Sequence, residues 1–348
     1  MIVALDAMGG DRAPKEPVRG ALLAHRELGI QVALVGAPEI IREELAHHGT
    51  PPSGIEIVAA SEAIGMDEQP AQAVRQKKDA SINVAMDLVK RGVANGVVSA
   101  GNTGAVMASA LLKLGRVPGV ERPAIGTMAP YTDLGILVLD VGANADCKPS
   151  YLVQFAQMGS VYMERVFGVA RPRVGLLNIG EEDTKGNELM QQVYPRLQQI
   201  DINFVGNVEP DRVHLAVADV LVTDGFTGNV AVKVTEGTAD FIFAQLRTAI
   251  MSRLQYRLAA LVLRPALMAM RRRMDYGEYG GAPLLGVDGV VIVAHGRADS
   301  QAIKNGLRLA REAAGSGMLD ALRGAFKRQA PEEPQTASAT PVPGETRV

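Results

Sequence analysis

Polar, glycine-rich segments follow several apolar runs of this sequence, and one of them has the residue types that bind an anion. It reads Ser99-Ala100-Gly101-Asn102-Thr103-Gly104 and precedes an apolar helical pattern. The first turn of a helix carries unpaired backbone N–H groups and partial positive charge, so it can hold phosphate without a basic side chain. A simple helix cap at Thr103 is a compatible alternative. We predict that Asn102, Thr103 and Gly104 contact phosphate.

The N-terminal run and a late run end in comparable segments. The first ends in Asp6-Ala7-Met8-Gly9-Gly10-Asp11, where two glycines would let backbone amides approach a ligand. A tight turn with a helix cap explains the same residues. His295 stands at the end of the late run, although most histidines are structural or solvated. We assign Asp6, Gly9, Gly10, Asp11 and His295 to the same predicted phosphate site.

Two further segments carry a lysine and an amide side chain. Lys185 lies in a polar loop and directly precedes Gly186 and a helical pattern. A lysine there can neutralise an anionic substrate or a developing oxyanion, and an ordinary surface lysine is the alternative. Asn229 ends the segment Asp224-Gly225-Phe226-Thr227-Gly228-Asn229 and can donate an amide N–H to a carbonyl oxygen or cap a helix. Asp224 and Gly228 complete the predicted substrate contacts.

Signatures of several other chemistries are absent from the sequence. It contains no Gly-x-x-x-x-Gly-Lys-[Ser/Thr] segment, no Gly-x-Gly-x-x-Gly in the first strand–helix turn and no Gly-x-Ser-x-Gly elbow. Cys147 is the only cysteine and the five histidines are scattered, so no metal-ligand spacing emerges. Cys147 also lacks an evident base partner, so we interpret it as a structural or incidental thiol. We predict neither a metal nor a cofactor.

Short apolar runs alternate with helical patterns along the chain. The runs are rich in Val, Ile and Leu without strict alternation, as in strands that are buried on both faces. This order predicts an α/β fold with a mainly parallel sheet and helices on both faces, and it places ligands at the carboxyl ends of strands. We expect strands over residues 2–6, 31–36, 55–60, 95–100, 125–129, 135–141, 173–179, 202–205, 219–223 and 290–294. We expect helices, among others, over residues 38–47, 81–91, 103–115, 150–167 and 187–199.

Composition narrows the class of protein. The 348 residues are 47% hydrophobic and carry a net charge of −2, which permits a large core and argues against nucleic acid as the main partner. One cysteine cannot form an internal disulfide, the N-terminus lacks a signal-peptide pattern, and no run of roughly 20 apolar residues occurs. We therefore expect a cytoplasmic protein. We predict an α/β domain over residues 1–329 and a disordered tail over residues 330–348, where Pro, Glu, Thr, Ala and Ser dominate.

A basic amphipathic stretch covers about residues 240–275 and contains no acid between residues 241 and 274. Three of its leucines have i, i+4, i+7 spacing and share a helical face. Pro265 should break or kink the helix and give a helical hairpin or two segments. Such a surface suits an anionic membrane. Alternatively, the stretch packs on the core or on a dimer partner, or it binds an acidic protein. The predicted membrane or partner surface consists of Arg253, Leu254, Arg257, Leu258 and Leu261.

Together these segments resemble the acyl-acyl carrier protein:phosphate acyltransferases, the PlsX enzymes of bacterial phospholipid synthesis. A further matching segment is Tyr279-Gly280-Gly281-Ala282-Pro283-Leu284-Leu285-Gly286. The segments occur in family order over residues 1 to about 328, and six of them in order are highly specific. They cover residues 6–11, 99–104, 178–187, 224–229, 279–286 and 295–296.

The resemblance implies a fold like that of the isocitrate and isopropylmalate dehydrogenases, without hydride transfer, and a homodimer. It implies a long-chain acyl-acyl carrier protein as donor, inorganic phosphate as acceptor, and acyl phosphate as a product that feeds phosphatidic acid and phospholipid synthesis. It further implies that a membrane glycerol-3-phosphate acyltransferase takes the product. Because that enzyme lies in the membrane, the basic stretch would provide peripheral contact with the inner face of the cell membrane. The lysine and asparagine thought to act in catalysis in that family match Lys185 and Asn229.

The expected reaction needs no covalent enzyme nucleophile, because phosphate is a competent nucleophile and a thioester is already activated. Three rivals remain at this point. An NAD-dependent decarboxylating dehydrogenase of similar fold would need metal-binding aspartates and an arginine cluster, which we cannot assemble. A phosphate acetyltransferase would use coenzyme A, and a comparison of donors separates it. A membrane-associated scaffold would show no phosphate-dependent turnover.

Overall fold

A single mixed sheet organises the computed structural model, which describes residues 1–273 and 276–327. Within these ranges it has eleven strands in the order β3-β2-β1-β4-β11-β10-β5-β6-β9-β7-β8. The strands are β1 (Ile2–Asp6), β2 (Gln31–Gly36), β3 (Ile55–Ala59), β4 (Gly96–Ser99), β5 (Ala124–Ala129), β6 (Ile136–Leu139), β7 (Arg173–Leu177), β8 (Asn203–Val208), β9 (Val220–Val222), β10 (Ala282–Leu285) and β11 (Val291–Val293).

The direction of the strands reverses in the middle of the sheet. Strands β3, β2, β1, β4 and β11 are parallel to one another, as are β6, β9, β7 and β8. Three successive antiparallel pairs, β11–β10, β10–β5 and β5–β6, separate the two sets. The sheet is therefore mainly parallel, as predicted, but the carboxyl ends of the two sets lie at opposite edges.

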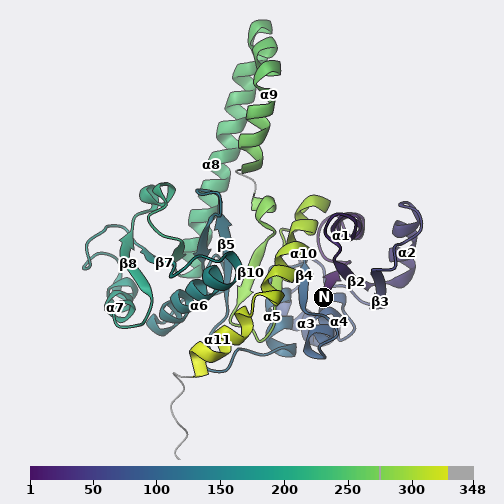
Figure 1. Cartoon of the computed structure of the whole chain (residues 1–348), viewed down its shortest axis with the longest axis horizontal. Coiled ribbons are helices and arrows are strands. Elements are labelled where there is room, and N and C mark those ends of the chain that lie inside the picture. The colour runs from purple at the N-terminus through teal and green to yellow at the C-terminus, as the bar shows by residue number, and fades with distance from the viewer. Residues whose placement is uncertain (274–275, 328–348) are drawn as a thin grey trace, which may run out of the picture.

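Helices cover both faces of the sheet, which confirms the predicted fold class (Figure 1). Neighbouring residues of one strand face opposite sides of the sheet. Val98 belongs to the core cluster that includes residues of α1, α6, α7, α10 and α11, whereas Val97 belongs to the cluster that includes residues of α3, α4 and α5. The helices are α1 (Lys15–Leu28), α2 (Pro38–Ala46), α3 (Pro70–Gln76), α4 (Ser81–Lys90), α5 (Thr103–Lys113), α6 (Pro149–Phe167), α7 (Glu188–Leu197), α8 (Gly225–Met251), α9 (Leu254–Arg273), α10 (Ser300–Gly315) and α11 (Met318–Lys327), with 3-10 turns at Pro210–Leu215 and Tyr276–Tyr279.

Helices α8 and α9 project away from the sheet as a hairpin (Figure 1). The chain turns between them at Ser252 and Arg253. Of the two predicted effects of Pro265, a break or a kink, the break is wrong, because α9 continues through this residue. Most of α9 is exposed, so water can bind the carbonyl that a proline leaves unpaired. No helix of the described ranges is both long enough and apolar enough to cross a membrane. The expected tail at residues 330–348 lies outside the described residues.

Candidate functional site

The buried carboxylate of Asp6 joins three elements at the carboxyl end of β1. Its Oδ1 accepts a hydrogen bond of 2.6 Å from the Ser81 hydroxyl, and its Oδ2 accepts one of 2.7 Å from the Ser99 hydroxyl. Burial raises the pKa of Asp6, although these hydrogen bonds oppose the rise. Asp6 is thus an acceptor that is already occupied by donors. This geometry suits the positioning of the surrounding loops better than direct contact with an anion.

The loops after β1, β4 and β11 meet at Gly10. Its φ of +102° is a conformation that glycine adopts without strain, and a Cβ at this position would lie 3.1 Å from both Ala100 Cβ and the Gly296 carbonyl oxygen. The backbone N–H of Asp11 donates to the same Gly296 oxygen at 2.8 Å. His295 lies in this third loop and is exposed; its Nδ1 accepts the Arg297 N–H at 3.1 Å. In a neutral ring this leaves the proton on Nε2.

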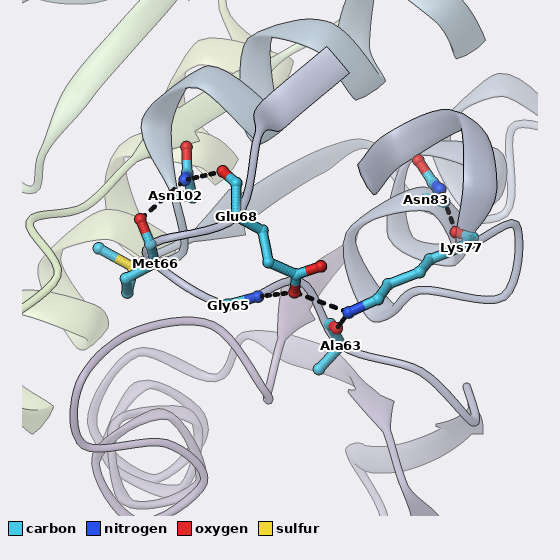
Figure 2. A network of polar contacts seen from close by, with 7 residues as sticks. All are labelled: Ala63, Gly65, Met66, Glu68, Lys77, Asn83 and Asn102. Atoms are coloured by element: carbon cyan, nitrogen blue, oxygen red, sulfur yellow. Dashed lines mark hydrogen bonds and ion pairs between the residues drawn. The ribbon is translucent and has the colours of Figure 1, made fainter. Parts of the chain in front are cut away.

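Asn102 caps α5 and also holds a neighbouring loop. Its Oδ1 accepts the Ala105 N–H at 3.2 Å, while its amide nitrogen donates to the carbonyl oxygens of Met66 at 2.9 Å and Glu68 at 3.3 Å (Figure 2). Gly104 allows this approach, since a Cβ there would lie 2.7 Å from Pro70 Cγ. The side chain of Asn102 is therefore occupied within the protein. An anion at this end would meet the backbone N–H groups of the first turn and the exposed Thr103.

An ion pair between Glu68 and Lys77, which sequence reasoning missed, shapes the loop next to Asn102. Figure 2 shows Glu68, whose Oε1 accepts hydrogen bonds of 2.6 Å from the Gly65 N–H and of 2.6 Å from Lys77 Nζ. Lys77 Nζ also donates to the Ala63 carbonyl oxygen at 2.8 Å. The Gly65 N–H and Lys77 together lower the pKa of Glu68. We call residues 61–69 the strap, because it runs past the ends of β4 and β11, where Met66 Cε lies 2.9 Å from the position of a Cβ on Gly296.

A second group of predicted residues surrounds the start of α8. Asp224 caps this helix, since its Oδ1 and Oδ2 accept hydrogen bonds of 2.8 Å from the N–H and the hydroxyl of Thr227. Gly228 packs directly on the Asp140 carbonyl oxygen, where a Cβ could not fit. These two predicted residues therefore set the position of the helix that carries Asn229.

Asp140 is a structural residue of this group that sequence reasoning missed. It is fully buried and accepts the backbone N–H groups of Gly142, Ala143 and Asn144 at 3.0, 2.7 and 2.8 Å. Burial raises its pKa despite these donors. The resulting turn supports Asn229, whose Nδ2 lies 3.1 Å from the position of a Cβ on Gly142. In the sequence, Asp140 could have been identified as an acidic residue that follows an apolar run and precedes small residues.

Asn229 faces a largely apolar cavity of about 450 Å³. Its exposed amide is free to meet a ligand that enters from the open side. The cavity lies between α8 and the loop after β6. It is lined by Gly142, Ala145, Gly225, Phe226, Asn229, Val230, Lys233 and Val234.

Lys185 follows β7, the strand beside β9, so it stands at the same sheet edge as Asn229. The amide of Asn178 donates to the Lys185 carbonyl oxygen at 3.1 Å and fixes the loop. The Lys185 ammonium is half-exposed and lies 3.8 Å from Glu182 Oε1. This loose pairing leaves the ammonium available to an anionic ligand.

The predicted site residues thus form two sets. The first follows β1, β4 and β11, and the second follows β7 and β9, whose carboxyl ends lie at the opposite edge of the sheet. The two sets are separated within one chain because β10 and β5 reverse the strand direction. The first set contains Asp6, Gly9, Gly10, Asp11, Asn102, Thr103, Gly104 and His295. The second set contains Lys185, Asp224, Gly228 and Asn229.

Comparisons with known proteins agree with the fold and indicate a family. Residues 1–320 of this chain match the sequence model of a protein family that is described as "Fatty acid synthesis protein". A phosphate acyltransferase from Desulfitobacterium hafniense (strain Y51) is 51% identical over 324 residues, which cover 93% of this chain and 96% of that relative.

Two solved structures share the fold at low sequence identity. The EutD phosphotransacetylase from Staphylococcus aureus matches with a TM-score of 0.62 and 16% identity, over 90% of this chain and 94% of the other. A 4-hydroxythreonine-4-phosphate dehydrogenase from Klebsiella pneumoniae matches with a TM-score of 0.54 and 16% identity, over 90% and 99%. At this identity the likeness concerns the fold alone.

Proposed function

Because the chain belongs to the fatty acid synthesis protein family and is a phosphate acyltransferase, we propose that it transfers a long-chain acyl group from an acyl carrier protein thioester to inorganic phosphate. The products are acyl phosphate and free carrier protein, and the acyl phosphate supplies phosphatidic acid and phospholipid synthesis. The observation that carries this proposal is the 51% identity to a phosphate acyltransferase over 93% of the chain.

In the proposed reaction a phosphate oxygen attacks the thioester carbonyl carbon, and the C–S bond then breaks. The leaving thiolate takes up the proton that the phosphate group loses. Asn229 donates an N–H to the oxyanion of the tetrahedral intermediate, and Lys185 offsets the negative charge nearby. The backbone N–H groups at Gly10 and at the start of α5 hold phosphate, whereas the Gly9 N–H donates to Asp6 and shapes the turn.

The raised pKa of the Cys147 thiol supports a mechanism in which the enzyme forms no covalent intermediate. Burial raises the pKa of this thiol to about 12, and the nearby carboxylates of Asp140 and Asp224 add to the rise. A thiol with this pKa holds almost no thiolate at neutral pH, and the thiolate is the nucleophilic form. The direct attack of phosphate is therefore the better supported route.

We also propose that the chain acts as a homodimer. The two sets of predicted residues lie at opposite sheet edges of one chain, so an interface between two copies gives them a way to meet. A mixture of a Lys185→Ala chain with a Thr103→Val chain would then regain activity that each lacks alone. A mixture of Lys185→Ala with Asn229→Ala, which alters one set only, serves as the matched control.

The hairpin of α8 and α9 supports peripheral contact with the inner face of the cell membrane. Leu254, Leu258 and Leu261 are all more than half exposed, and Arg253 and Arg257 lie next to them on the same exposed segment. Exposed apolar side chains with neighbouring cations suit an anionic lipid surface. The proposed location lets a membrane glycerol-3-phosphate acyltransferase receive the acyl phosphate.

The proposed function is tested by incubating the purified chain with palmitoyl-acyl carrier protein, with and without phosphate. We expect carrier thiol to appear only with phosphate, together with palmitoyl phosphate detected by mass spectrometry. Palmitoyl-coenzyme A in place of the carrier protein thioester tests the coenzyme A alternative. Release of thiol at the same rate without phosphate would contradict the proposal.

A further inference from the structure

An exposed apolar stripe runs along α8 from the position of Asn229 toward the hairpin. It consists of Phe226, Val230, Val234 and Phe241, which are between 48% and 67% exposed. At 100° per residue these four side chains fall within a sector of about 80°. Large apolar side chains that gather on one face of a helix usually indicate a binding surface.

The cavity described above covers the first part of this stripe. Phe226, Val230 and Val234 line it, and its polar side chains are Asn229 and Lys233. Lys233 Nζ lies 3.1 Å from Glu236 Oε2, so the charge of this lysine is partnered on its own helix. Beyond the cavity, a Cβ at Gly237 would meet nothing within 4 Å, so the path along the helix stays open. The lining therefore favours a flexible apolar ligand with one polar end.

We propose that the stripe binds the acyl chain of the donor, with the thioester carbonyl at Asn229 and the chain running along α8 toward the hairpin. This inference rests on the proposed function, since it takes Asn229 as the group that meets the carbonyl. The methylenes next to a carbonyl at Asn229 must lie against the neighbouring side chains on α8. Phe226 and Val230, on either side of Asn229 in the sequence, provide the apolar contact that these methylenes require.

The length of the stripe agrees with a long acyl chain. Phe226 and Phe241 are 15 residues apart in one helix, which corresponds to about 22 Å at 1.5 Å per residue. One leaflet of a bilayer, half of a hydrocarbon core of about 30 Å, spans about 15 Å, so the stripe is long enough to cover a lipid acyl chain. A two-carbon acyl group would use only the first contacts, so the stripe distinguishes long from short donors.

The direction of the stripe has a consequence for product release. Helix α8 continues from the cavity into the hairpin, whose exposed leucines are proposed to contact lipid. The methyl end of the bound chain therefore points toward the lipid surface. An acyl phosphate could leave along the same apolar path without exposing its chain to water.

The test compares palmitoyl- and butyryl-acyl carrier protein as donors for the wild type and for Val230→Asn, in the presence of phosphate. The variant should lose about tenfold or more in kcat/KM for palmitoyl relative to butyryl, because a polar group interrupts the path of the long chain. Val234→Thr, which keeps the side-chain shape, should shift the same ratio in a fully folded protein. Val93→Asn is the matched control, because Val93 is 50% exposed and Val230 is 48% exposed. Val93 lies in the loop after α4 and is not part of the stripe.

An unchanged donor ratio in both α8 variants, with an active wild type, would overturn the acyl-chain assignment and leave the proposed function intact. If the wild type consumes neither donor in a phosphate-dependent way, both the acyl-chain assignment and the proposed function are wrong. The molar mass in solution is measured in parallel by light scattering. If Val230→Asn lowers the mass and keeps the donor ratio, the stripe is an interface between two copies and the assignment is wrong.

Discussion

The Ser99 hydroxyl donates a 2.7 Å hydrogen bond to the buried carboxylate of Asp6, and this contact joins the ends of β1 and β4. The loops that follow these strands hold Gly10 and Asn102, so the bond sets the relative position of two predicted phosphate contacts. Ser81 makes the corresponding contact from the start of α4. A buried carboxylate with satisfied partners can thus order a site without touching its ligand.

The titration of Asp6 predicts a pH dependence of stability. Burial is the largest influence on its pKa and raises it above the ordinary 3.8. The folded protein therefore retains this proton at a pH where the unfolded chain has lost it, so stability falls as pH rises from 3.8 through the folded value. Each unit of elevation corresponds to about 1.4 kcal/mol.

Asp6→Asn removes the titrating group and should abolish this fall. Urea unfolding of the wild type and the variant, from about pH 4 to about pH 8, measures the difference in the free energy of unfolding. Asp140, whose pKa is also raised by burial, is present in both proteins and cancels in the comparison. Parallel pH profiles of the two proteins would show that Asp6 does not titrate in this way.

The Arg173–Asp219 pair should show the opposite sign. Partial burial raises the pKa of Asp219. Two hydrogen bonds from the Arg173 guanidinium, of 2.8 and 3.1 Å, a third of 2.8 Å from the Arg173 backbone N–H, and the charge of Arg173 together bring this pKa below 3.8. The contribution of this pair is present above pH 3.8 and is lost as pH falls through the lowered folded pKa. Asp219→Asn should cost about 0.5–1 kcal/mol at neutral pH, because Arg173 is partly exposed and solvent screens the pair.

The measurement is urea unfolding at neutral pH and at about pH 3, where the cost of Asp219→Asn should shrink. Glu164→Gln is the matched control, since Glu164 and Arg165 are 3.7 Å apart and both about half exposed. This control should change the free energy of unfolding by less than about 0.5 kcal/mol at either pH. An equal cost of Asp219→Asn at both pH values would contradict the assignment.

The sequence predicts the strands well where apolar residues dominate, as in Gln31–Gly36, which the structure reproduces. It misses β10, because Ala282–Leu285 is only four residues long and contains Pro283. That strand reverses the direction of the sheet and separates the two sets of site residues. Strand direction depends on which strands pair, and this information is not contained in local apolar patterns.

The strap is a second feature of the site that the sequence does not predict. Glu68 and Lys77 are nine residues apart and do not share a regular helical face, so their spacing gives no reason to pair them. The pair forms only because α3 and the strap return to the same end of the sheet. The sequence placed helix caps near the right positions but at the wrong residues. Asn102 rather than Thr103 caps α5, and Asp224 rather than Asn229 caps α8.

Lys77→Met should loosen the strap while keeping an unbranched side chain. The variant loses the hydrogen bonds of Lys77 Nζ to Glu68 and to the Ala63 carbonyl oxygen. Because both groups are partly exposed, we expect amide exchange in residues 61–69 to rise by roughly tenfold, rather than global unfolding. Hydrogen exchange read by mass spectrometry measures this change, and Lys78→Met, at the exposed neighbouring lysine, should leave it unaltered.

Leu258→Glu should weaken binding to anionic vesicles by about tenfold or more. The change removes a leucine that would be buried in lipid, worth at least about 1.5 kcal/mol, and adds a charge that the lipid surface repels. Sedimentation with vesicles that contain an anionic lipid measures the bound fraction. Leu112→Glu is the matched control, because Leu112 is 55% and Leu258 57% exposed but Leu112 lies on α5. Equal binding by the two variants would contradict a membrane role of the hairpin.

Lys185→Ala and Asn229→Ala should each lower kcat by about 100- to 1000-fold, since each removes one group that stabilises developing negative charge. Asn229→Asp keeps the size of the side chain but replaces its donor with a carboxylate, so it should be at least as slow as Asn229→Ala. Lys90→Ala, at an exposed lysine of α4, should retain the wild-type rate. The rates are measured as phosphate-dependent release of carrier thiol, with circular dichroism to verify folding. Folded Asn229 variants with near-normal rates would move the oxyanion contact to another donor and would leave the cavity without its proposed polar anchor.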